Sequence, residues 1–224
     1  MPSANKAQRP KQVFIGDYPV PSIIYHDKSN SFLTPGEILG QGAFGMVFAT
    51  EYKGERRALK VQRKSSVAIA EYRLHGSLKH DHVVEVVESF ETVAFLFMIM
   101  ERCAKPLWAP PTAMPSLSLH LAKKVLKGVV LGLHFLHQRN ILHRDIKPQN
   151  ILLTAMGAKI ADLGLALQDV SKPRMRGMGG TPAYMAPEVE KRERYGLCAD
   201  LFSLGVMAHE MISGVRGTVG VCDL

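Results

Sequence analysis

The stretch Ile141–Leu153, I-L-H-R-D-I-K-P-Q-N-I-L-L, indicates the fold and chemistry of this chain more directly than any other. Two short apolar runs flank a polar string, a pattern that predicts short buried strands holding a rigid loop and displaying polar side chains such as His143. Asp145 is followed two residues later by Lys147 and three residues after that by Asn150. A carboxylate, an ammonium group and a carboxamide at this spacing suit acid–base chemistry beside a phosphate and a metal ion.

The composition is that of a folded protein. The chain has 224 residues, of which 46% are hydrophobic, enough for one large or two small domains. Its formal net charge of +8 would attract acidic partners. The basic residues are nevertheless dispersed in small clusters, without the aromatic-interleaved basic stripe of nucleic-acid binders. We therefore interpret most of this charge as solvated surface and expect no nucleic-acid partner.

Cysteine usage and apolar runs predict the compartment. Cys103, Cys198 and Cys222 lie far apart, which gives neither a disulfide framework nor a metal-ligand spacing. A reducing, intracellular setting follows, with the cytoplasm expected and the nucleus as the alternative. The N-terminus lacks an apolar signal core, and the longest apolar run, Val93–Met100, is too short to span a bilayer. We therefore expect no membrane association.

A glycine-rich turn, Gly40–Gly45 (G-Q-G-A-F-G), lies between two predicted strands. Alone, the G-x-G-x-x-G pattern also fits a dinucleotide-binding fold or an ordinary glycine turn. A dinucleotide-binding fold requires a helix directly after the glycines and an acidic residue about twenty residues further on. Here the strand-like run Met46–Tyr52 follows, and the equivalent position is Lys60. A hairpin whose glycine turn covers phosphates fits better.

Taken together, these segments resemble the catalytic domain of eukaryotic protein kinases of the serine/threonine type. The resemblance covers Phe32 to about Gly214 and rests on the glycine turn, A-L-K-V at 58–61, H-R-D-I-K-P-Q-N at 143–150, A-D-L-G at 161–164 and G-T-P-A-Y-M-A-P-E at 180–188. It implies an α+β fold of two lobes, a small antiparallel β lobe and a mainly helical lobe. The segments expected are an N-terminal tail at 1–31, the small lobe and hinge at 32–103, and a partial large lobe at 104–224.

The resemblance implies ATP and Mg²⁺ as cofactors and serine or threonine hydroxyls of proteins as acceptors. Asp145 would accept the hydroxyl proton and Lys147 would neutralise the γ-phosphate. Asn150 and Asp162 would hold Mg²⁺ through oxygen ligands, and Thr181 would bridge Asp145 and Lys147. The implied nucleotide contacts are Gly40, Gln41, Gly42, Ala43, Phe44, Gly45, Val47, Ala58, Lys60, Met100, Glu101, Cys103 and Leu152. Taken singly, Asp145 also suits a turn and Asn150 a helix cap.

Lys60 is implied to contact the α- and β-phosphates and to need an acidic partner on the following helix. Read alone, it would be an ordinary surface lysine. Glu71 lies in the helix-compatible run Ala68–Leu74, whereas Glu85 and Glu88 lie in a β-type run, so Glu71 is the predicted partner. Ten residues separate Lys60 from Glu71, fewer than kinases usually have, which predicts a shortened helix or leading loop.

Two helices are predicted in the large lobe. Apolar residues recur at intervals of three and four from Leu119 to Leu136, which indicates an amphipathic helix. His134 and His137 on that helix are interpreted as packing or surface residues and not as metal ligands. The run Asp200–Met211 resembles the buried kinase helix whose aspartate holds the catalytic loop. Prolines at 104–116 predict an irregular connection.

The activation segment departs from the usual kinase pattern. Arg144 stands where kinases couple the catalytic loop to a phosphorylated residue of that segment. Between Ser171 and Thr181 the chain has no hydroxyl group. We hypothesise that activation needs no phosphate there, or that Ser171 carries it. Leu163 stands where kinases usually have phenylalanine, and as a bulky apolar residue it is expected to pack in the same place.

The end of the sequence leads to a competing hypothesis. The chain stops at Leu224 without the family's last helices and without the arginine that normally pairs with the carboxylate at the Glu188 position. A buried carboxylate without a partner is costly. The alternative is a C-terminally truncated, catalytically poor kinase-like module that binds nucleotide or a protein partner. The oligomeric state is left open.

Overall fold

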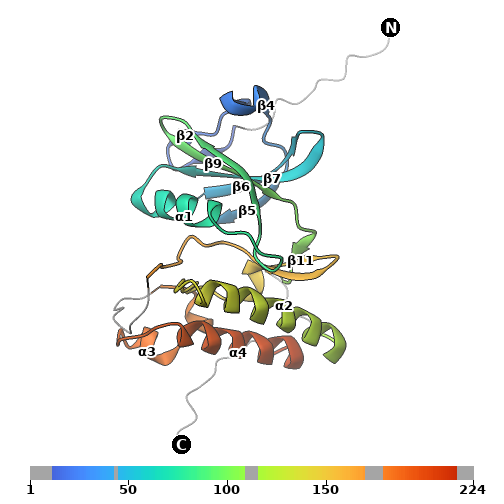
Figure 1. Cartoon of the computed structure of the whole chain (residues 1–224), viewed down its shortest axis with the longest axis vertical. Coiled ribbons are helices and arrows are strands. Elements are labelled where there is room, and N and C mark those ends of the chain that lie inside the picture. The colour runs from blue at the N-terminus through green and yellow to red at the C-terminus, as the bar shows by residue number, and fades with distance from the viewer. Residues whose placement is uncertain (1–11, 43–44, 109–115, 170–178, 216–224) are drawn as a thin grey trace, which may run out of the picture.

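The computed structural model describes residues 12–42, 45–108, 116–169 and 179–215, and these form two lobes (Figure 1). The small lobe is built on an antiparallel sheet, and the large lobe is mainly helical. This confirms the α+β, two-lobed fold expected from the sequence.

The small lobe contains a five-stranded sheet in the order β5-β6-β7-β9-β8, with every neighbouring pair antiparallel. Its strands are β5 (Ile38–Gly42), β6 (Gly45–Tyr52), β7 (Glu55–Arg63), β8 (Val86–Glu91) and β9 (Phe95–Glu101). The two-residue period of β7 divides its side chains between two clusters. Leu59 and Val61 pack into one apolar core, and Ala58 packs into a second cluster with Met98 and Met100.

Residues 12–33 add two short hairpins to the small lobe. The first pairs β1 (Phe14–Ile15) with β2 (Tyr18–Pro19), and the second pairs β3 (Ile24–His26) with β4 (Ser31–Leu33) around the 3₁₀ turn η1 (Asp27–Ser29). A tail or loosely docked extension was expected up to residue 31. In the described part of that expected tail, Val20 and Ile24 are buried in the small-lobe core, because their apolar side chains pack against one face of the five-stranded sheet.

Helix α1 (Ser66–Gly76) packs on β8 and β9. The Ser65 hydroxyl caps its first turn by accepting a hydrogen bond from the N–H of Ala68 at 3.1 Å. The helix has only 11 residues, as expected from the short spacing after Lys60. It still buries Ala68, Glu71 and Leu74.

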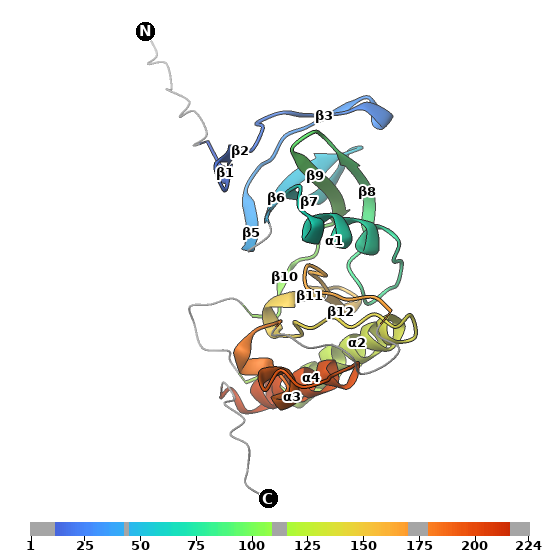
Figure 2. The same cartoon turned by 90° about the vertical axis from the view of Figure 1, so that its left-hand side faces the viewer.

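The large lobe is organised around helices α2 (Leu119–His137) and α4 (Cys198–Ser213). Figure 2 shows a small sheet between these helices and the small lobe, with strands β10 (Lys105–Pro106), β11 (Ile151–Thr154) and β12 (Gly157–Ile160). The described part of the large lobe also contains the 3₁₀ turns η2 (Pro148–Asn150) and η3 (Pro182–Tyr184) and the short helix α3 (Pro187–Glu190). The predicted apolar stripe of α2 faces the core from Ala122 to Leu136, whereas Leu119 at its start is 60% exposed. The same core includes Met207 and Met211 of α4.

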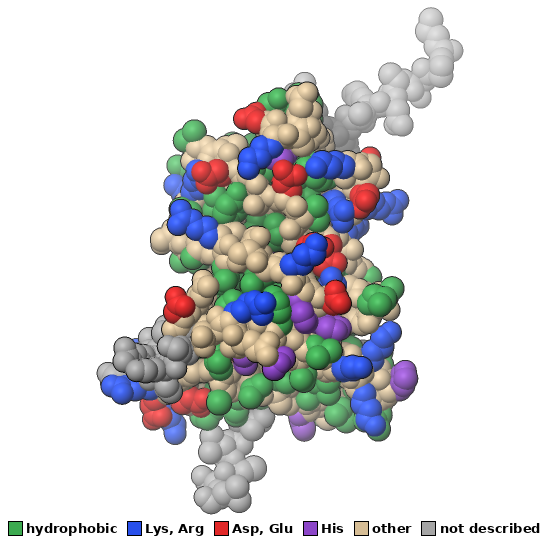
Figure 3. Space-filling view, in the orientation of Figure 1, with side chains coloured by type: hydrophobic (Ala, Val, Ile, Leu, Met, Phe, Trp, Pro, Cys, Tyr) green, Lys and Arg blue, Asp and Glu red, His purple; other side chains and the backbone are tan. Residues whose placement is uncertain are grey.

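Strand β12 also connects the two lobes. The N–H of Val84 donates to the Ile160 carbonyl at 2.9 Å, and the N–H of Ile160 donates to the His82 carbonyl at 2.9 Å. The Lys159 ammonium donates to the Glu101 carboxylate at 2.5 Å, which joins β12 to the end of β9. Figure 3 shows Lys and Arg side chains interspersed with Asp and Glu on the face in view. In the described ranges, no helix is long and apolar enough to cross a membrane.

The packing of the N-terminal hairpins predicts a contrast between two adjacent isoleucines. Ile24 is 3% exposed and Ile23 is 62% exposed. Ile24→Ala should lower the free energy of unfolding by about 2 to 5 kcal/mol, because it leaves a cavity in the small-lobe core. The matched control Ile23→Ala should change it by less than about 0.5 kcal/mol. Urea unfolding measures both, and equal midpoints for the two variants would contradict the packing described here.

Candidate active site

A buried carboxylate holds the loop that contains Asp145. The Asp200 side chain is fully buried on α4 and accepts hydrogen bonds from the backbone N–H groups of His143 and Arg144, each at 2.9 Å. Arg144 has a φ of 69°, in the left-handed region that non-glycine residues rarely adopt. Such a conformation persists where several contacts fix it. His137 of α2 places its Nε2 2.8 Å from the same carboxylate, a contact that the helical pattern alone does not predict.

The loop is largely buried, so the expectation of a displayed polar string is wrong for three of its residues. His143 is fully buried, and Asp145 and Asn150 are 8% and 7% exposed. The His143 Nδ1 accepts from the N–H of Asp145 at 3.2 Å, which leaves Nε2 to donate to the Ala161 carbonyl at 3.1 Å. The physical reason is that buried backbone groups need partners, and the side chains of the loop supply them.

The Asp145 carboxylate is the centre of a polar cluster. The Thr181 hydroxyl donates to its Oδ1 at 2.7 Å, and the Asn150 amide donates to its Oδ2 at 2.9 Å. The Lys147 ammonium lies 2.6 Å from Oδ2 and donates to the Thr181 hydroxyl at 2.7 Å. The structure therefore places Thr181 between Asp145 and Lys147.

Gly180 permits this approach of the activation segment to the loop. Its φ is +113°, and a Cβ at this position would lie 2.3 Å from the backbone oxygen of Arg144. Any side chain would push Thr181 away from Asp145. Ser171, the residue hypothesised to carry an activating phosphate, lies outside the described residues.

Lys60 is not a surface lysine. It is 8% exposed, and its ammonium pairs with the Glu71 carboxylate and donates to Asp162 Oδ1 at 2.9 Å. Burial lowers the pKa of Lys60, but the charges of Asp162 and Glu71 outweigh it, so the pKa lies above its ordinary value. Glu88 is engaged elsewhere, since its carboxylate accepts from the Tyr52 hydroxyl at 2.5 Å.

The amide of Gln62 is a part of this site that the sequence analysis missed. Gln62 is fully buried, and its Nε2 donates to Glu71 Oε2 at 2.7 Å. The two-residue period of a strand places Gln62 on the same face of β7 as Lys60, and this period is the sequence signal that points to Gln62.

Apolar residues predicted to contact the nucleotide lie in one cluster. It contains Val47, Ala58, Met100, Cys103 and Leu152, together with Met98 and Ala161, which the sequence analysis did not name. Burial and the nearby Glu101 carboxylate raise the pKa of Cys103 to about 11, so this thiol stays neutral.

The glycine turn joins β5 to β6. Gly40 pairs with Val47, Gln41 with Met46, and Gly42 with Gly45. A Cβ on Gly45 would lie 2.3 Å from the Val61 carbonyl of β7, so only glycine fits at this position. Ala43 and Phe44 lie outside the described residues.

Asn150 and Asp162 offer side-chain oxygens that could bind a cation. The Asn150 amide nitrogen donates to Asp145, to its backbone oxygen at 2.8 Å and to its carboxylate at 2.9 Å, so the amide oxygen is the atom that could bind a ligand. The Asp162 side chain is 46% exposed. Desolvation raises the pKa of Asp162, but the Lys60 charge and hydrogen bond outweigh it, so the pKa is lowered and the group stays ionised. Hard oxygen donors of this kind, completed by phosphates and water, suit Mg²⁺.

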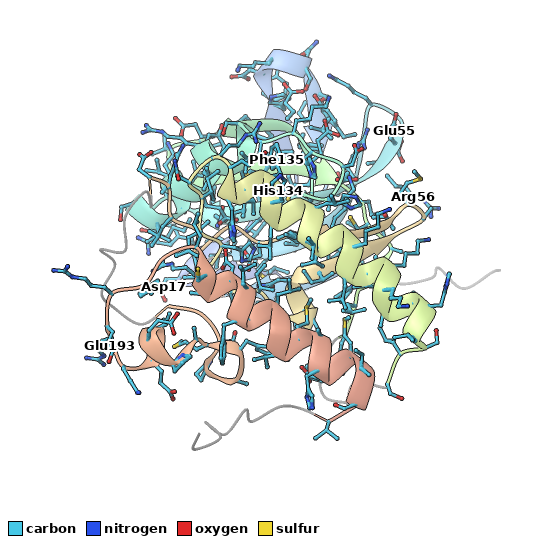
Figure 4. The ribbon with its side chains drawn as sticks, turned by 60° about the horizontal axis from the view of Figure 1, so that its bottom comes forward. Asp17, Glu55, Arg56, His134, Phe135 and Glu193 are labelled. Carbon is cyan, nitrogen blue, oxygen red and sulfur yellow. The ribbon has the colours of Figure 1, made fainter. Side chains whose placement is uncertain are left out.

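Two histidines near the C-terminal end of α2, His134 and His137, differ in their surroundings. Figure 4 labels His134 beside Phe135 on α2, where His134 is exposed. Within the described ranges, no group of three or more His, Cys, Asp or Glu side chains is arranged to hold a metal ion. His134 is therefore a surface residue, as expected, whereas His137 contacts Asp200.

These features are those of protein kinases, and comparison with known proteins agrees. Residues 33–217 match the family described as the protein kinase domain, and this chain belongs to that family. It is 36% identical over 188 residues to serine/threonine-protein kinase fused of Drosophila melanogaster, covering 79% of this chain and 23% of that protein. It is 36% identical over 185 residues to serine/threonine-protein kinase pak-1 of Caenorhabditis elegans, covering 79% of this chain and 32% of that protein.

A plant protein is similar to this chain over a comparable number of residues. Serine/threonine-protein kinase TIO of Arabidopsis thaliana is 33% identical over 189 residues, covering 80% of this chain and 14% of that protein. The chain therefore spans less than a third of the length of these three relatives.

The Lys60–Asp162 contact predicts a pH dependence of stability. The folded-state pKa of Asp162 is lowered, so the unfolded chain binds its proton first as the pH falls. The stabilisation by ionised Asp162 is present above about pH 4 and is lost as the pH falls through the folded pKa. Asp162→Asn should therefore lose less stability than the wild type on acidification from about pH 5 to about pH 3.

Urea unfolding at several pH values measures this difference. Asp17→Asn is the control, because Asp17 is exposed and far along the chain from this site. It should follow the wild-type curve. Identical acid dependence of Asp162→Asn and the wild type would contradict the role of Lys60 in holding Asp162 ionised.

Proposed function

We propose that this chain is the catalytic domain of a serine/threonine protein kinase that transfers the γ-phosphate of ATP to hydroxyl groups of proteins. The observation that carries the proposal is the arrangement around Asp145, whose carboxylate is hydrogen-bonded to Asn150 and Thr181 and lies beside Lys147. The three relatives described above, each named a serine/threonine-protein kinase, support the same acceptor class.

Asp145 acts as the proton acceptor in this proposal. The substrate hydroxyl would lie beside the Thr181 hydroxyl at Asp145 Oδ1 and give its proton to the carboxylate as its oxygen attacks phosphorus. The bond from the γ-phosphorus to the bridging oxygen breaks, and ADP leaves. Lys147 neutralises the negative charge on the transferred group.

The other residues position the nucleotide. Lys60 contacts the α- and β-phosphates, held by its pair with Glu71. Asn150 and Asp162 hold Mg²⁺, which supplies charge neutralisation on the phosphate oxygens when bound. The glycine turn covers the phosphates, and the apolar cluster of Val47, Ala58, Met100, Cys103 and Leu152 packs on the adenine beside the backbone of Glu101.

The packing of Arg144 supports activation without a phosphate in the activation segment. The Arg144 Nε donates to the Leu165 carbonyl at 2.5 Å, and a Cβ on Gly179 would lie 2.9 Å from its Nη1. The Arg144 guanidinium, which would otherwise bind an activating phosphate, is therefore packed against the backbone of the activation segment near Leu165 and Gly179. Mass spectrometry of the active protein that found a required phosphate in the segment would count against this step.

Asp145→Asn tests the proposed function on the full 224-residue chain. The wild type should phosphorylate a generic basic protein in the presence of Mg·ATP, and the variant should lose about 10²- to 10⁴-fold in kcat, because it cannot accept the proton. Both proteins should melt at a higher temperature with Mg·ATP, since Asp145 is not a nucleotide contact.

The two measurements separate the competing hypotheses. Stabilisation by Mg·ATP without Asp145-dependent transfer would overturn the catalytic proposal and leave the nucleotide-binding module. Transfer to tyrosine alone would overturn the acceptor class.

A further inference from the structure

The Glu71 carboxylate is held at both of its oxygens by side chains from one strand. Lys60 pairs with Oε1, and the Gln62 amide donates to Oε2 at 2.7 Å. Gln62 is fully buried and Glu71 is 2% exposed, so water does not complete either contact. The two donors stand two residues apart on β7 and therefore on the same face of the sheet.

We propose that Gln62 is a positioning residue for nucleotide binding, acting through Glu71 on Lys60. The inference rests on the proposed function, in which Lys60 contacts the phosphates. A single ion pair leaves the plane of the carboxylate free to turn, because the terminal torsion of a glutamate is broad. The second hydrogen bond fixes that plane and directs Oε1 at the Lys60 ammonium.

Position 62 requires a side chain that donates a hydrogen bond to Glu71 and carries no charge. A cation at residue 62 would compete with Lys60 for Glu71, and a carboxylate would repel Glu71. The Gln62 amide donates a hydrogen bond to Glu71 without adding a charge beside Lys60, Glu71 and Asp162. The reversed amide would place its oxygen against the Glu71 carboxylate, acceptor against acceptor, so the donor assignment follows from chemistry.

The cost of keeping this amide argues for a specific role. Within the described residues, Gln62 Oε1 is buried without a hydrogen-bond partner. An apolar side chain of similar length would avoid that cost if packing were the only demand on the position.

The neighbouring titratable group does not replace Gln62. His75 lies one helical turn after Glu71 and is 1% exposed, with its Nε2 2.7 Å from the Val84 carbonyl. Burial lowers the pKa of His75, so it is neutral and directs its proton to that carbonyl. Glu71 therefore depends on Lys60 and Gln62 for its partners.

A double-mutant cycle tests the proposal on the full chain. Gln62→Met keeps the length of the side chain and removes the donor, and it should weaken Mg·ATP binding about tenfold in the wild-type background. In a Glu71→Gln background the same change should have no further effect, because the carboxylate it positions is gone. A residue needed only for packing would weaken binding equally in both backgrounds.

The readouts are the Mg·ATP dissociation constant from calorimetry, and KM for ATP and kcat from the transfer assay. Gln62→Met should raise the Mg·ATP dissociation constant and the KM for ATP, and it should change kcat less. The dissociation constant does not depend on turnover, so absence of transfer in the wild type would overturn the proposed function while this inference is still tested by binding.

Two further variants keep the result decisive. Gln138→Met makes the same substitution at an exposed position directly after α2 and should leave both constants unchanged. Gln62→Glu preserves the volume of the side chain and should weaken binding more than Gln62→Met does, because of its charge. Equal loss in both backgrounds, or no loss in folded Gln62→Met and Gln62→Glu, would overturn the proposal.

Discussion

The position of Asp145 depends on the buried carboxylate of Asp200. Its two oxygens accept from two successive backbone N–H groups, so the peptide between His143 and Arg144 is fixed in both position and orientation. The left-handed conformation of Arg144 costs on the order of 1–3 kcal/mol, and a support of this kind is what lets it persist. Because the carboxylate is fully buried, each of these hydrogen bonds is stronger than it would be in water.

Helix α4 extends the same support to the activation segment. Asp200, Ser203 and Glu210 recur at intervals of three and seven residues and lie on one buried face of the helix. Ser203 donates to the Tyr184 carbonyl at 2.7 Å, and the Tyr184 hydroxyl donates to Glu210 at 2.5 Å. One helix face therefore holds both the loop that carries Asp145 and the turn that follows Thr181, which fixes the distance between them.

The sequence predicts the parts of this site that lie in local patterns. The order of motifs predicted the two lobes and the α2 and α4 helices, and helical context selected Glu71 over Glu88, which the structure places on β8. Burial of His143 was not predictable, because polarity in a loop does not show whether the backbone will fold over it. The contact of Gln62 with Glu71 was not predictable either, since strand period gives a face and not the residue of the next helix that reaches it.

The two carboxylates that face Lys60 divide the charge around it unequally between a buried and a half-exposed position. Two carboxylates face one ammonium, so the group carries an excess negative charge that a bound cation would balance. The two carboxylates differ in their surroundings. Glu71 is buried and held at both oxygens, whereas Asp162 is half exposed, has a φ of 61° and accepts from the Lys60 ammonium. Lys60 thus has one partner that is buried and one that is half exposed. In the proposed function, this asymmetry would let Asp162 turn to a metal ion while Glu71 keeps the ammonium in place.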